Sequence, residues 1–96
     1  MIVTYTTEVI DKESIPSLNF PRDPVDKSKD QLLILKKKLR RSMILGNIHR
    51  TKMRIIFEDE NGTKEVQTTI WAVGDRNIVL KKGIIIPIHR LIDVIL

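Results

Sequence analysis

The amino-acid sequence predicts an α+β fold that is mainly β, in which one helix precedes a small, strongly bent barrel of five strands. Apolar residues keep helical spacing over about residues 28–44, and from Lys52 onward their spacing falls to two, which is typical of strands. The expected strands are short, rich in Ile and Val, and joined by tight turns. Such strands favour a closed barrel, because closure removes exposed sheet edges. The length of 96 residues fits one domain.

The first residues are expected to form an arm over 1–26, outside a barrel domain that we place over 27–96. Ile2–Thr7 is typical of a short strand that pairs with the body. Three prolines then disfavour helix in the residues that precede them: Pro16, Pro21 and Pro24. We expect Phe20, an aromatic residue in this proline-rich loop, to dock the arm onto the body.

The predicted helix leads the barrel domain and occupies at most residues 27–45. Asp26 or Ser28 can cap its first turn by accepting a hydrogen bond from a free backbone N–H. Apolar residues recur three and four positions apart and so share one face: Leu32, Leu35, Leu39 and Met43. Basic residues fall on the opposite face: Lys37, Lys38, Arg40 and Arg41. Gly46-Asn47 is expected to end the helix, because both residues tolerate a left-handed backbone.

The strands follow in order. Alternating apolar residues from Met53 to Phe57 predict the first strand, and Asn61-Gly62 predicts a hairpin. A long return strand through Val66–Val73 is expected to bend and serve two sheets. Three short strands complete the barrel: Asn77–Lys81, Ile84–Ile88 and Leu91–Leu96.

The last two strands are apolar on both faces, which a solitary barrel does not explain. Their outer face requires a cover, because exposed apolar surface of this extent is unusual in a monomer. The apolar face of the helix is one candidate, and a second copy of the chain is the other. We therefore expect a homo-oligomer formed through these strands.

The positive charge is concentrated in one segment. The chain has a net charge of +5, but residues 27–54 alone hold ten Lys and Arg against the single acid Asp30. A localised basic patch is the electrostatic footprint of a protein that binds a polyanion. The same pattern also fits a solvated helix face that keeps a small protein soluble. The candidate phosphate contacts are Lys36, Lys37, Lys38, Arg40, Arg41, Arg50, Lys52 and Arg54.

The chain contains the short motifs Asn77-Ile78-x-Leu80 and Ile88–Ile92, and both resemble motifs of Sm-like proteins. Asn77-Ile78-x-Leu80 is similar to the end of the family's first motif, and Ile88–Ile92 lies where bacterial Sm-like RNA chaperones have a second one. The resemblance covers about residues 28–96 and implies a small barrel, RNA binding and ring assembly. It extends to other SH3-like barrels and to small uncharacterised bacterial proteins. His89 and Arg90, before the last strand, are the candidate rim residues for an anionic ligand.

Several classes of function are disfavoured by the composition. The chain has no cysteine, which excludes disulfides and thiolate chemistry, and His49 and His89 lack neighbours at metal-ligand spacing. We expect no catalysis, no cofactor and no metal. No apolar run approaches the length of a membrane span, and the N-terminus lacks the basic region of a signal peptide, so the expected location is the cytoplasm.

Trp71 is the only tryptophan, and the pattern leaves its role open. An exposed Trp71 can stack on a nucleobase, whereas a buried one closes the barrel or packs beneath the helix. We expect a small non-enzymatic protein that contacts nucleic acid, RNA rather than DNA, through the basic helix face. The alternatives are a homo-oligomeric interaction module and a basic helix that lies on an anionic membrane.

Overall fold

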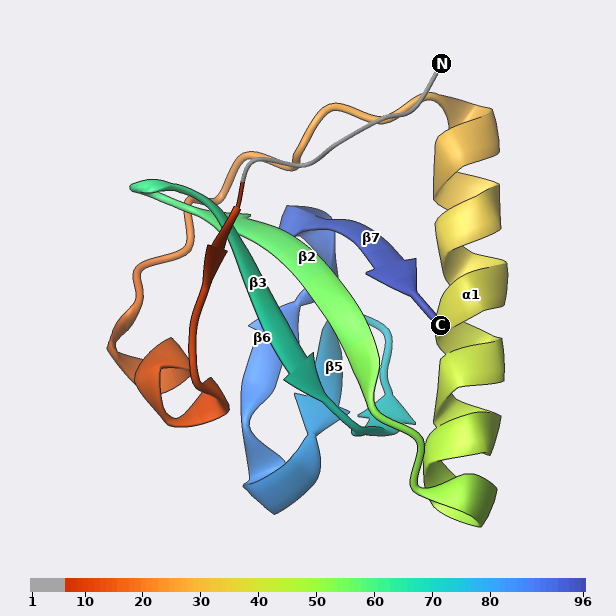
Figure 1. Ribbon diagram of the computed structural model, residues 1–96. Helices are drawn as coiled ribbons and strands as arrows, with labels where there is room; N and C mark the ends of the chain where they lie inside the picture. The colour runs from red at the N-terminus through yellow and green to blue at the C-terminus, as the bar shows by residue number, and fades with distance from the viewer. Residues whose placement is uncertain (1–6) are drawn as a thin grey trace.

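A computed structural model describes residues 7–96 and shows one long helix and seven strands (Figure 1). The helix α1 spans Lys29–His49. The strands are β1 (Glu8–Val9), β2 (Met53–Asp59), β3 (Gly62–Thr68), β4 (Ile70–Val73), β5 (Asn77–Leu80), β6 (Ile85–Pro87) and β7 (Leu91–Ile95). Short 3-10 helices complete the fold: η1 (Lys12–Ser17), η2 (Lys81–Gly83) and η3 (Ile88–Arg90).

The strands form two sheets, and the α+β class is confirmed. One sheet has the order β1-β3-β2-β7, and the other has the order β4-β5-β6. Only Thr69 separates β3 from β4, so one bent segment passes from the first sheet to the second, as the long return strand predicted. The ladders of residues 7–96 do not close into a barrel, so the five-stranded barrel stays a prediction.

The start of α1 is confirmed and its predicted end is wrong. The Ser28 side chain accepts a hydrogen bond from the Gln31 N–H, and the Gln31 side chain accepts one from the Ser28 N–H, which makes a capping box. Gly46 lies inside the helix, which continues to His49. A Cβ atom on Gly46 would lie 2.3 Å from the Ile70 carbonyl oxygen, so this glycine allows α1 to lie close against β4.

The buried stripe of α1 differs from the predicted one. Leu35 and Leu39 are buried as expected, but Leu32 is 39% exposed and Met43 is only half-buried. The small residues Ser42 and Gly46 continue the buried stripe instead, and at Gly46 the backbone of β4 leaves no room for a larger side chain.

The segment before α1 packs on the sheets. β1 pairs in parallel with β3, and Ile15 of η1 is only 1% exposed within the core. Phe20 contacts Phe57 of β2 with ring centroids 5.8 Å apart, which confirms that this residue docks the arm. Apart from Thr7, the strand expected over Ile2–Thr7 lies outside the described residues.

Candidate nucleic-acid interface

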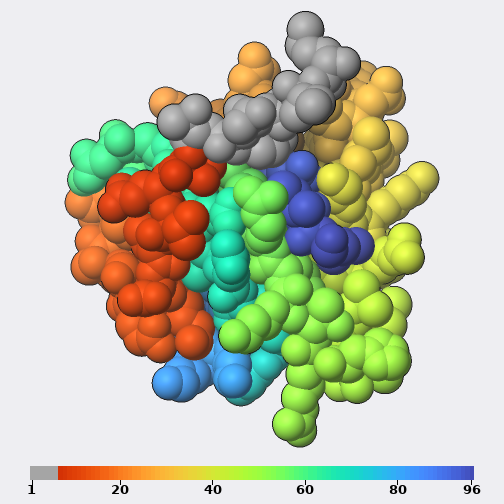
Figure 2. Space-filling view, viewed as in Figure 1, coloured from red at the N-terminus to blue at the C-terminus, as the bar shows by residue number. Residues whose placement is uncertain are grey.

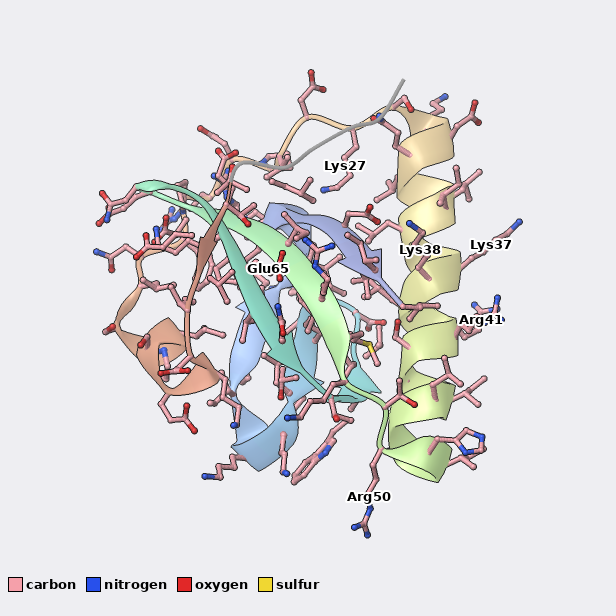
Figure 3. The ribbon with its side chains drawn as sticks, viewed as in Figure 1. Lys27, Lys37, Lys38, Arg41, Arg50 and Glu65 are labelled. Atoms are coloured by element: carbon pink, nitrogen blue, oxygen red, sulfur yellow. The ribbon has the colours of Figure 1, made fainter. Side chains whose placement is uncertain are left out.

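The outward face of α1 carries a cluster of exposed cations, which we call the basic face: Lys36, Lys37, Arg40 and Arg41. None of them forms an ion pair with a residue in the described range 7–96. The only acid in α1 is Asp30, in the first turn. Lys37 and Arg41 extend away from both sheets (Figure 3). The basic face is therefore open to a partner and is not neutralised by its own helix.

Lys38 and Arg54 are neutralised by carboxylates of the sheet. Lys38 lies beside β7, where its Nζ is 2.8 Å from Asp93 Oδ1, so its predicted place on the outward face is wrong. Arg54 donates two hydrogen bonds to Glu65 across the β2–β3 ladder, over 2.7 and 3.1 Å. Lys38 thus links α1 to β7, and Arg54 links β2 to β3. We therefore leave both residues out of the basic face.

Glu65 is a buried carboxylate whose charge is stabilised locally. The hydrogen bond from Arg54 holds its pKa below the usual value, against the opposing effect of burial, and a hydrogen bond from Gln67 adds to it. The same contact raises the pKa of Arg54. An ionised Glu65 therefore stabilises the folded protein at neutral pH.

Replacing Glu65 with Gln is expected to lower the free energy of unfolding at pH 7 by about 1 kcal/mol, because a charge-assisted pair is lost. A carboxylate with a lowered pKa stabilises the fold above its unfolded-state pKa, near 4.5, and loses that effect as the pH falls through its folded-state value. Urea denaturation as a function of pH should therefore show the two proteins converging below about pH 4.5. A difference that persists unchanged in acid contradicts this role of Glu65.

His89 and Arg90 hold the loop that precedes α1. His89 Nε2 lies 2.8 Å from the Pro21 carbonyl oxygen, and the His89 carbonyl accepts a hydrogen bond from Val25 N–H. Arg90 is 6% exposed and donates to the carbonyl oxygens of Asp23 and Glu58. The Arg90 guanidinium thus links the loop before α1 to β2. We therefore leave Arg90 out of the proposed surface.

A cleft of about 720 Å³ lies beside His89, between the 24–27 loop and the β4–β5 turn. Its lining mixes basic side chains with the carboxylates Asp26 and Asp75. Burial lowers the pKa of Lys27 at its edge, and the nearby charge of Arg90 lowers it further. This cleft does not concentrate charge of one sign.

Arg50 and Lys52 line a different cleft, at the C-terminal end of α1, together with Trp71 and Lys81. Trp71 is 47% exposed, which settles the question that the sequence left open. Lys81 was not among the predicted site residues, because the two lysines before Gly83 have the pattern of an ordinary polar turn.

Comparisons with known proteins do not place the chain in a family. No protein-family model matches it, and no curated protein or solved structure is significantly similar to it. The resemblance to Sm-like and SH3-like proteins therefore stays a prediction based on the sequence, namely its order of elements and the two motifs. Within residues 7–96, no cluster of three or more potential metal ligands is present. No helix of the described chain is long and apolar enough to cross a membrane.

Proposed function

We propose that this protein is a non-enzymatic nucleic-acid-binding protein and that the basic face of α1 contacts phosphates. The observation that carries the proposal is the exposure of Lys36, Lys37, Arg40 and Arg41 without an ion-pair partner among the described residues. Phosphate contacts from Lys and Arg supply most of the affinity of nucleic-acid-binding proteins that do not read sequence.

The spacing of these cations argues against a face that serves solubility alone. Lys36 and Arg40 are four residues apart, as are Lys37 and Arg41, so each pair has like charges on neighbouring turns. Such pairs destabilise a helix by about 0.2–0.5 kcal/mol each, whereas alternating Glu and Lys would stabilise it. A bound polyanion would neutralise these cations and remove the repulsion between them. The like-charge spacing is therefore better explained by polyanion binding than by solubility.

RNA is proposed rather than DNA because of the resemblance to Sm-like proteins. The strand pairing supports the barrel that this resemblance implies. The predicted barrel begins with β2 and ends with β7. β2 pairs with both β3 and β7, so the first and last strands of the predicted barrel lie side by side. We therefore include the closed barrel in the proposal.

Salt dependence tests the proposed function. Four phosphate contacts to a single strand predict that affinity falls about 50-fold when the salt concentration rises from about 50 to 200 mM. Fluorescence anisotropy of a labelled single-stranded RNA, titrated with the protein at several salt concentrations, measures this slope. An affinity that does not change with salt, or no binding at the lowest salt, contradicts the proposal.

Assembly into a homo-oligomer is the second candidate function. Ile85 of β6 is 51% exposed, and β6 is the last strand of its sheet. It therefore presents an apolar side chain and an edge that no strand within residues 7–96 pairs with. Strand pairing between copies of the chain would cover both. Light scattering at micromolar concentration is expected to give the mass of a multimer, and a monomeric mass contradicts this candidate.

A further inference from the structure

The cleft at the C-terminal end of α1 combines an aromatic ring with several cations. Its volume is about 660 Å³, within the range of roughly 300–1,000 Å³ that small-ligand sites occupy. Arg50, Lys52 and Lys81 supply positive charge, and no carboxylate of the described residues lines the cleft. None of these three cations has an ion-pair partner within residues 7–96. The cleft is therefore suited to an anion with a flat, apolar part.

The position of Trp71 is produced by an irregularity in the second sheet. In the ladder between β4 and β5, Ile70 pairs with Leu80 and Ala72 pairs with Val79, so Trp71 is an extra, unpaired residue. A β-bulge of this kind redirects the side chain of its extra residue, and bulges are frequent beside functional sites. Ile70 remains buried in the core while Trp71 lines the cleft.

Arg50 occupies a backbone position that usually belongs to glycine. It ends α1 in the left-handed conformation, with φ 51° and ψ 37°, and its N–H bonds to the Gly46 carbonyl oxygen. Glycine would adopt this conformation at no steric cost. The Arg50 side chain extends from the end of the helix into solvent (Figure 3). This conformation is unfavourable for a residue with a Cβ atom, and in this fold it places Arg50 in the lining of the cleft.

We propose that this cleft binds one unpaired nucleotide of a single-stranded nucleic acid. The base stacks on Trp71, and the adjoining phosphates contact Arg50, Lys52 and Lys81. This inference rests on the proposed function and adds a requirement to it, namely that the strand be unpaired. A base within a duplex is covered by its neighbours on both faces and cannot stack on an indole ring.

Intrinsic fluorescence tests the inference directly, because Trp71 is the only tryptophan in the chain. We expect a short oligoadenylate to quench the emission of the full chain strongly. The same strand paired with its complement, and inorganic polyphosphate, should bind through charge and leave the emission nearly unchanged. Binding of the oligoadenylate without a change in emission overturns the inference and leaves the proposed function standing. A blue shift with anionic vesicles and no response to oligoadenylate overturns it in favour of a membrane surface.

Matched variants separate stacking from charge. Trp71→Ala is expected to weaken oligoadenylate binding roughly 5- to 100-fold, whereas Trp71→Phe retains most of the affinity because it retains a ring. Arg50→Gly is expected to weaken binding without lowering the melting temperature, since glycine suits the left-handed position. Wild-type affinity in both Trp71→Ala and Arg50→Gly overturns the inference. If neither variant differs from wild type while charge reversal on α1 abolishes binding, the proposed function survives and the cleft has no part in it.

Discussion

Reversing the charges of Lys37 and Arg41 together is expected to weaken binding of single-stranded RNA roughly 25-fold or more at about 0.1 M salt. Each side chain accounts for about one released counterion in the proposed interface, so the loss of two of the four contacts made by the basic face also lowers the salt dependence. The two new carboxylates then repel the phosphates, which lowers the affinity further. Anisotropy titrations of the Lys37→Glu/Arg41→Glu variant measure both quantities.

The control for this variant carries the same net charge at a distant place. Lys12→Glu/Arg22→Glu places two carboxylates in η1 and the following loop, and residues 7–17 form the flank of the molecule opposite α1 (Figure 2). We expect this control to bind RNA with nearly wild-type affinity. An equal loss in the two variants means that overall charge, and not the basic face, determines binding.

Replacing Gly46 with Ala is expected to destabilise the protein by about 2–3 kcal/mol, although alanine is the better helix former by about 1 kcal/mol. The added Cβ would lie 2.3 Å from the Ile70 carbonyl oxygen and 2.9 Å from the Thr69 methyl carbon. A backbone oxygen within a sheet cannot move alone, so α1 has to shift away from β4. Thermal unfolding should show a melting temperature lower by roughly 10–20 °C.

Gly74→Ala is the matched control, because its added Cβ would lie at an ordinary contact distance of 3.4 Å from the Asn77 carbonyl oxygen. We expect it to leave the stability nearly unchanged. If Gly46→Ala is instead as stable as wild type or more so, α1 does not lie against β4 as closely as the structure shows.

The fold was predictable where the determinants are local. The cap at Ser28, one of the two predicted, depends on residues within one helical turn, and the β2–β3 hairpin depends on the residues of its own turn. The end of α1 was not predictable, because Gly46 is locally a stop signal and its actual role depends on β4, more than twenty residues away. At Gly46, the contact between α1 and β4 overrides the local tendency of glycine to end a helix.

In the candidate site too, features with local determinants were predictable and features that depend on tertiary contacts were not. Helical spacing predicted the outward position of three members of the basic face, Lys37, Arg40 and Arg41, because their place on the helix is a local property. It also put Lys38 on that face, where the ion pair with Asp93 on β7 shows it does not lie. The burial of Arg90 depends on the loop around Asp23 folding over η3, which no local pattern indicates. The exposure of Trp71 depends on the register between β4 and β5, and a bulge of one residue is not visible in the alternation of side chains.

An amide chemical-shift map of the full chain, titrated with single-stranded RNA, tests the central claim most directly. We predict that the largest shift changes fall on residues 36–41 of α1 and on the cleft residues Arg50 and Trp71, while η1 and β1 change little. Changes concentrated on η1 and β1, or spread evenly over the molecule, would contradict the assignment of nucleic-acid binding to the basic face.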